Sequence, residues 1–177
     1  MEQRIENSGA FALATLGLDS GEAVTAEAGA MVSMSPGLEV QTKGRSGGLL
    51  KGLKSSVLGG ESFFVNTYVA QDPAELSVAP ALPGDIVHRM LGAETVYLTS
   101  GSYLASSASV EVDTSWGGAK TFFSGEGLFL LKVTGPGDLF ASSYGAIAEL
   151  ELSEGQKHIV DTSHVVGFTE GVGYEVR

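Results

Sequence analysis

Apolar and polar side chains alternate with a period of two residues in four short segments, at 38–41, 110–113, 129–133 and 148–152. Such alternation is typical of strands that bury one face, because successive side chains on a strand point to opposite sides. Turn-forming runs of Gly, Pro, Ser and Asp separate strand-like segments, at 35–37, 82–85, 135–138 and 153–156. The pattern predicts a protein of short strands and tight turns.

This pattern also accounts for the glycine content of the chain. The 177 residues include 25 glycines, and glycine supplies the backbone angles that tight turns require. Almost no segment shows a sustained helical period, so we predict an all-β sandwich or open barrel. The nearly apolar run 9–18 is interpreted as a buried strand.

An internal repeat connects the two parts of the sequence. Residues 28–42 align with 100–114 at an offset of 72, and 60–65 align with 125–130 at an offset of 65. The first pair of segments matches at Gly29/Gly101, Leu38/Val110, Glu39/Glu111, Val40/Val112 and Thr42/Thr114. The repeat predicts an internally duplicated chain, with one β-roll in residues 1–92 and a second in residues 93–177.

The change in offset, from 72 to 65, places seven extra residues in the first half, in loop 43–58. This loop carries four positive charges and no acidic residue, in a chain whose net charge is −11. Exposed leucines beside lysines are typical of a partner or membrane-surface contact. We therefore predict an interaction loop formed by Lys43, Arg45, Leu49, Leu50, Lys51, Leu53 and Lys54.

Several motifs in order resemble a known family: they lie at 47–54, 60–64, 83–86, 125–130 and 160–168. The chain resembles prokaryotic proteins related to the mitochondrial-biogenesis (altered inheritance of mitochondria) protein. The resemblance implies a fold like that of the tryptophan RNA-binding attenuation protein, a short double-stranded β-helix. It also implies a ring, expected to be a homotrimer. It implies no agreed biochemical activity.

Composition excludes several chemistries. The chain has no cysteine, which excludes disulfides, thiolate nucleophiles, iron–sulfur clusters and Cys-based zinc sites. No apolar run approaches the about 18 residues of a membrane-spanning helix, and the first residues are acidic, so we expect a cytoplasmic protein. The net charge of −11 makes nucleic acid an unfavourable partner.

The three histidines, His88, His158 and His164, do not have the spacing of a metal site on a β-roll. Such a site needs a His-x-His pair with a later Glu and His. His158 and His164 are weak metal candidates, and we favour a structural role for both. We expect no cofactor.

Asp161, Ser163 and His164 are the residue types of a Ser-His-Asp hydrolase. The chain has no Gly-x-Ser-x-Gly elbow, and adjacent Ser and His on a strand point to opposite faces. We interpret this segment as a strand end and turn. In the second half, Trp116, Phe122 and Phe123 are possible partner anchors, although aromatic residues also close the open end of a β-roll.

The sequence therefore predicts a non-catalytic scaffold or interaction protein that forms a homo-oligomer. Its contact surfaces would be loop 43–58 and the faces of the ring. An alternative is a protein that binds an amino acid or another metabolite in clefts between protomers, by analogy of fold. RNA binding is disfavoured by the acidic charge.

Overall fold

A computed structural model of the chain describes residues 1–42, 57–58, 61–114 and 129–175. These residues form strands and two short 3-10 helices, η1 (Ser100–Ser102) and η2 (Thr162–His164). The described part of the chain has no α-helix. The prediction of an all-β protein is confirmed.

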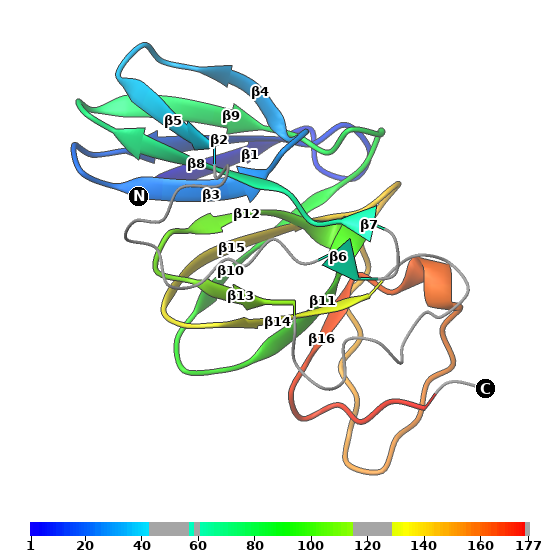
Figure 1. Cartoon of the computed structure of the whole chain (residues 1–177). Coiled ribbons are helices and arrows are strands. Elements are labelled where there is room, and N and C mark those ends of the chain that lie inside the picture. Colours follow the sequence, from blue (N-terminus) through cyan, green and yellow to red (C-terminus); the bar gives the residue numbers. More distant parts are fainter. Residues whose placement is uncertain (43–56, 59–60, 115–128, 176–177) are drawn as a thin grey trace.

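The strands form three larger antiparallel sheets (Figure 1). The first sheet has the order β1 (Glu2–Glu6), β2 (Leu13–Leu18), β9 (Ala74–Val78), β4 (Met31–Met34). The central sheet has the order β10 (Ile86–Leu91), β15 (Gly137–Ser142), β12 (Tyr103–Ser107), β3 (Ala23–Glu27), β8 (Val65–Ala70), β5 (Leu38–Thr42). The third has the order β13 (Glu111–Asp113), β14 (Leu130–Thr134), β11 (Val96–Thr99), β16 (Gly167–Thr169). A small ribbon joins β6 (Val57–Leu58) to β7 (Glu61–Ser62).

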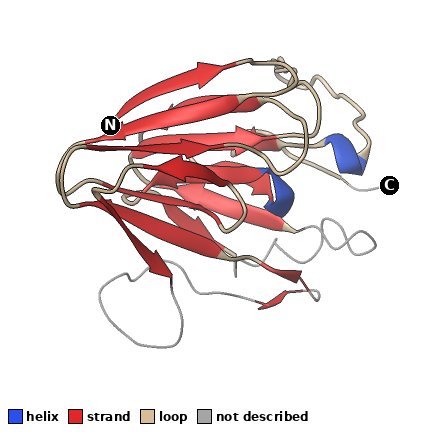
Figure 2. Ribbon diagram, turned by 90° about the horizontal axis from the view of Figure 1, so that it is seen from above, coloured by secondary structure: helices blue, strands red, loops and turns tan. Residues whose placement is uncertain are grey.

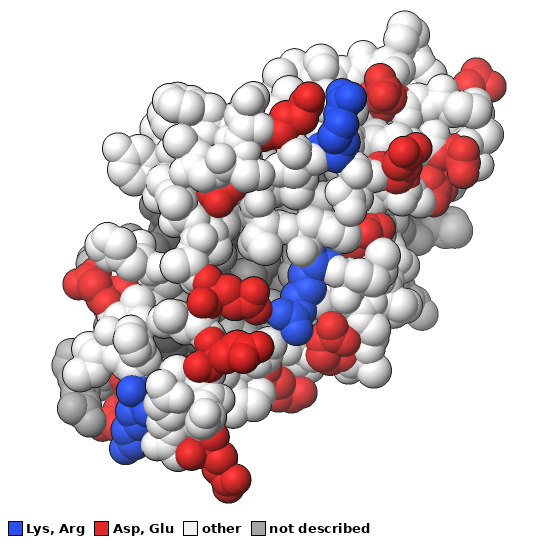
Figure 3. Space-filling model, turned by 180° about the vertical axis from the view of Figure 1, so that it is seen from behind, with Lys and Arg blue, Asp and Glu red and all other residues white. Residues whose placement is uncertain are grey.

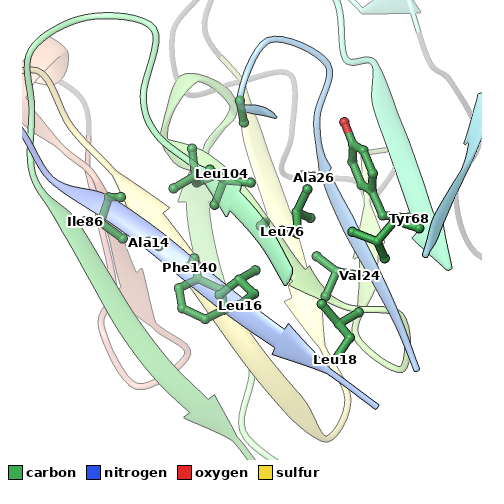
Figure 4. Close-up of a cluster of buried hydrophobic side chains, with 14 of the residues drawn as sticks. Ala14, Leu16, Leu18, Val24, Ala26, Tyr68, Leu76, Ile86, Leu104 and Phe140 are labelled. Atoms are coloured by element: carbon green, nitrogen blue, oxygen red, sulfur yellow. The ribbon is translucent and has the colours of Figure 1, made fainter. Parts of the chain in front are cut away.

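The central sheet contributes side chains to two hydrophobic clusters. Strand β15 shows how: Phe140 belongs to a cluster shared with the first sheet, whereas Leu139 and Ala141 belong to a cluster shared with the third sheet. This alternation follows from the two-residue period of a strand. Figure 4 shows Phe140 beside Leu16 of β2 in the first cluster. The molecule is thus a layered β-sandwich.

The strands lie roughly side by side, and η1 and η2 lie towards the same end as the C-terminus (Figure 2). Strand β12 pairs with β3, and β10 pairs with β15, so the central sheet draws strands from both of the halves expected in the sequence, 1–92 and 93–177. The internal duplication and the boundary near residue 92 stay predictions.

Three of the four segments with alternating side chains form strands close to the predicted positions, as β5, β13 and β14. The fourth prediction is wrong: residues 148–152 have no regular structure and are exposed. Their sequence alternates, but within the described chain no strand pairs with them, and a strand needs a hydrogen-bonded neighbour. The buried strand expected over 9–18 is shorter, since β2 begins at Leu13 and only alternate residues of β2 are buried.

Candidate interaction surfaces

Most residues of the predicted contact sites lie outside the described part of the chain. The loop residues Lys43, Arg45, Leu49, Leu50, Lys51, Leu53 and Lys54 are among them, as are Trp116, Phe122 and Phe123. Their roles stay predictions. The surfaces that follow come from the described residues.

The turn at Asp161 does bring its serine and histidine together. The Asp161 carboxylate caps η2, accepting hydrogen bonds from the Ser163 amide at 3.1 Å and the Ser163 hydroxyl at 2.6 Å. These bonds, with a contact from His164, hold the pKa of Asp161 below its usual range. The turn with side-chain caps is confirmed, whereas the strand end expected there is wrong, because residues 157–160 have no regular structure.

The same turn lacks the geometry of a hydrolase. Ser163 Oγ lies 3.0 Å from His164 Nδ1, and Asp161 Oδ1 lies 3.4 Å from that same nitrogen. A catalytic histidine contacts its serine through one ring nitrogen and its aspartate through the other. His158 lies in the exposed segment before this turn, and no contact joins it to His164 in the part of the chain that is described. Among those residues, no group of three His, Cys, Asp or Glu side chains is placed to hold a metal ion.

A polar cluster that the sequence did not reveal connects β10, β15 and β1. His88 Nε2 lies 2.7 Å from Asp138 Oδ1, and Gln3 Nε2 lies 3.3 Å from His88 Nδ1. The Ser107 hydroxyl donates to Asp138 Oδ2 at 3.2 Å and accepts from the Asp138 amide at 3.0 Å. Both carboxylate oxygens and the amide of Asp138 therefore have partners, and the contact of Gln3 with His88 links the first sheet to the central one.

An open cavity of about 290 Å³ lies beside this cluster. Its lining combines two carboxylates, two serine hydroxyls and apolar side chains, from Met1, Leu18, Gly21, Glu22, Ala23, Ser107, Ala108, Ser109 and Asp138. Hydrogen bonds from the Asp19 amide and the Met1 amino group lower the pKa of Glu22. These carboxylates already have partners: the Met1 amino group lies 3.0 Å from Glu22 Oε1, and both carboxylate oxygens of Asp138 take part in the polar cluster.

Three loops are held together at one end of the molecule by Asp85. Its Oδ1 accepts hydrogen bonds from the amides of Gly9 at 2.8 Å and Ile86 at 2.9 Å. The neighbouring Gly84 carbonyl accepts from Ala12 at 2.9 Å, and the Asp85 amide donates to Gly145 at 3.0 Å. These bonds tie together the loops at 7–12, 79–85 and 143–147.

These three loops expose a large apolar side chain each. The exposed fractions are 71% for Phe11, 62% for Leu82 and 80% for Tyr144. Apart from Asp85, which is used in the hydrogen bonds above, the three loops contain no charged residue. We name Phe11, Leu82 and Tyr144 the apolar loop end. Exposed apolar groups on a rigid support are typical of a partner contact.

Strand β4 is a second apolar surface. It lies at the edge of the first sheet and pairs with β9 alone among the described strands. All four of its residues are exposed, and Val32 exposes 57% of its surface. The surrounding residues 28–37 include no charged side chain. An uncharged apolar edge is a template for pairing with another strand, and soluble proteins ordinarily protect such edges.

A comparison with models of known protein families shows which family the chain belongs to. The family model described as "Mitochondrial biogenesis AIM24" matches residues 3–177. The chain belongs to the AIM24 family. This confirms the family resemblance of the sequence motifs, whereas the likeness to the attenuation protein stays a prediction.

Two bacterial relatives illustrate the family. An uncharacterised protein of Streptococcus pyogenes serotype M6 is 31% identical over 184 residues, which cover 100% of this chain and 74% of that protein. A crystal structure of a Streptococcus pyogenes protein superposes with a TM-score of 0.62 at 28% identity. That match covers 82% of this chain, and this chain spans 65% of the crystallised one.

In the described residues, no helix is both long and apolar enough to span a membrane.

Proposed function

We propose that this AIM24-family protein is a non-catalytic oligomeric scaffold. The observation that carries the proposal is the exposed, uncharged edge of β4, in which Val32 is the most exposed of the large apolar residues. An edge of this kind is prone to uncontrolled pairing in a monomer, so a defined neighbour is the simplest way to cover it. The non-catalytic role is supported by the turn at Asp161, where Ser163 and Asp161 share one ring nitrogen of His164.

The assembly proposed is a homotrimeric ring in the cytoplasm. A ring forms when each chain offers one surface to the next and the rotation closes. The sequence has no cysteine, so the fold needs no oxidising compartment in which to form disulfides. The apolar loop end and loop 43–58 would then be the surfaces that contact a protein partner or a membrane surface.

Nucleic acid is an unfavourable partner for such a ring. On the face seen in Figure 3, basic side chains lie singly among acidic ones. Binding of RNA phosphates requires several basic groups that act together. The net charge of −11 adds a repulsive field.

A matched pair of lysine substitutions tests the proposal. Val32→Lys places a charge on β4, and Val87→Lys places the same charge on β10, where Val87 is also exposed. We expect Val32→Lys to elute as a single chain on gel filtration, whereas Val87→Lys elutes with the wild type. If both variants keep the elution volume of an oligomeric wild type, β4 is not the contact edge.

The cavity supports a second candidate function, the binding of a small metabolite. Asp138 and Glu22 both line it, and a ligand amine would compete for Glu22 with the Met1 amino group, which now lies 3.0 Å from that carboxylate. Thermal-shift assays with a set of amino acids and amines test this function, because a ligand that binds only the folded state raises the melting temperature. A rise that is lost in Asp138→Asn supports metabolite binding, and no rise with any compound at millimolar concentration contradicts it.

A further inference from the structure

Residues 148–160, which we name the arm, include a segment with the sequence pattern of a strand that forms no strand in the structure. Ala148, Leu150 and Leu152 alternate with Glu149 and Glu151, the pattern of a strand with one buried face. The turn at 153–156 reverses the chain, where the Gln156 amide donates to the Ser153 carbonyl at 2.9 Å and Gly155 has a φ of +77°. The arm has the pattern of a strand and turn but no sheet beside it.

The arm buries none of its apolar side chains within its own chain. All thirteen residues are exposed, and Leu150 exposes 57% of its surface. Leu152, Ile159 and Val160 are exposed as well. Pairing with a sheet edge would satisfy the backbone hydrogen-bonding groups of the arm and bury its leucines, and both effects lower the free energy.

Both ends of the arm are fixed to the body of the protein. Before it, the Ile147 amide contacts Asp85 Oδ2 at 3.5 Å. After it, Asp161 caps η2, and the following β16 pairs with β11. The arm is therefore a projection held at two points.

The sheet edges differ in how they are protected. Among the edge strands of the three larger sheets, charged residues occur on β1 (Glu2, Arg4, Glu6), β10 (Arg89), β5 (Glu39) and β13 (Glu111, Asp113). Only β4 and the three-residue β16 lack them in the described part of these edges. Charges on an edge oppose the addition of a further strand. Of these two uncharged edges, β4 is the longer one. Its register with β9 shifts between Met31 and Ser33, and such an irregularity is itself a partial protection of an edge.

We propose that the arm of one protomer adds as a strand to the β4 edge of a second copy of the chain. The inference rests on the proposed oligomer and names the two surfaces that meet in it. Strand β4 itself carries no carboxylate to repel Glu149 and Glu151 of the arm, and the carboxylate of Glu27 before it is held by the Gly29 amide at 2.8 Å. Hydrogen bonds between the two backbones and burial of Leu150 against Val32 and its neighbours would hold the contact.

The arm and β4 of one chain cannot meet each other. In Figure 1 the arm hangs below β16 at one end of the molecule, whereas β4 lies at the opposite end. The contact is therefore between different surfaces of two copies, which generates a reciprocal dimer, a closed ring or an open fibre. A ring of three satisfies every arm and every β4 edge.

Cross-linking between introduced cysteines tests this contact, because the chain has no cysteine of its own. The double variant Leu150→Cys/Val32→Cys, treated with a short bismaleimide, is expected to give covalent dimers and closed trimers. An equimolar mixture of the two single variants is expected to give dimers, and each single variant alone none. The matched control is Leu150→Cys/Val87→Cys, which places the second cysteine on β10 and is expected to stay unlinked.

A charge on the arm provides a second measurement. Leu150→Glu is expected to raise the concentration of half-assembly at least about tenfold, which corresponds to roughly 1.4 kcal/mol. Because Leu150 is exposed, the Leu150→Glu and Leu150→Ser variants are expected to have the same melting temperature when both are monomeric.

The outcomes separate the two proposals. If the wild type is oligomeric and Leu150→Cys/Val32→Cys gives no cross-link, the arm contact is wrong and the scaffold stands. If Val32→Cys alone forms dimers, two β4 edges pair with each other and the arm contact is again wrong. A wild type that is monomeric overturns both proposals.

Discussion

The imidazole of His88 lies 2.7 Å from the carboxylate of Asp138. This contact joins β10 to β15, two neighbouring strands of the central sheet. Asp138 is buried, and His88 also contacts Gln3 on the first sheet. The ring of His88 packs on Phe140 with 4.9 Å between ring centroids. His88 therefore makes both polar and apolar contacts at the place where the first and central sheets meet.

We expect His88→Ala to lower the free energy of unfolding by about 1–3 kcal/mol, because it leaves the buried Asp138 carboxylate with one partner fewer. Arg89→Ala on the same strand is the control, and an exposed side chain of this kind changes stability by within about 0.5 kcal/mol. Denaturation by urea measures both. Equal stabilities of the two variants would mean that the His88–Asp138 bond contributes little.

Alkaline pH should destabilise the protein through Tyr103. This side chain is buried, and its hydroxyl donates to the Thr25 carbonyl at 3.1 Å and lies 2.9 Å from Ser106 Oγ. Burial raises the pKa of Tyr103, whereas in the unfolded chain a tyrosine ionises near about 10. The folded chain thus holds the proton longer, and its stabilisation is present below pH of about 10 and is lost as pH rises above it.

This loss amounts to roughly 1.4 kcal/mol for each pH unit above about 10. Tyr103→Phe removes the titrating hydroxyl, so its stability should fall less steeply between about pH 9 and 11. The free energy of unfolding, measured for both proteins over this range, tests the prediction. The other tyrosines are common to both proteins, and parallel curves would contradict a role for Tyr103.

Gly84 is required by a close backbone approach. A Cβ atom at this position would overlap the carbonyl oxygen of Ser143, so we expect Gly84→Ala to cost about 2 kcal/mol or more. Gly171→Ala is the matched control, because its added Cβ would meet no atom within 4 Å. The melting temperatures of the two variants measure the difference, which should vanish if the loops at Gly84 adjust freely.

The apolar loop end should bind hydrophobic probes. The double variant Phe11→Ser/Tyr144→Ser is expected to weaken the fluorescence of a bound anilinonaphthalene dye, because both side chains are exposed. Its stability should stay within about 0.5 kcal/mol of the wild type. Val87→Ser removes an exposed side chain elsewhere and is the control. Equal dye binding by all three proteins would show that the loop end is no binding surface.

The sequence predicts the strands better than it predicts the contacts between them. The alternation at 38–41 and 129–133 identifies β5 and β14, because each strand has a hydrogen-bonded neighbour. In β5, Leu38 is buried whereas Val40 is exposed. The same alternation at 148–152 fails, because no described strand of this chain pairs with it. A period of two shows which residues suit a strand, but it does not show whether the partner strand exists in the same molecule.

The polar cluster of His88 and Asp138 could not be predicted from the sequence, for a related reason. His88 and Asp138 are fifty residues apart, and only the pairing of β10 with β15 brings them together. Ser163 and His164 show the converse, since neighbours expected on opposite faces of a strand meet on a 3-10 turn. Local patterns report a strand period, whereas these contacts depend on the pairing of distant strands and the geometry of turns.

The mass of the wild-type particle in solution tests the central proposal most directly. Light scattering during a dilution series at micromolar concentrations should give about three times the 18.2 kDa of one chain, as expected for a closed ring in which each β4 edge is covered. A stable particle of 18.2 kDa would contradict the scaffold proposal, and a particle of two chains would contradict the ring.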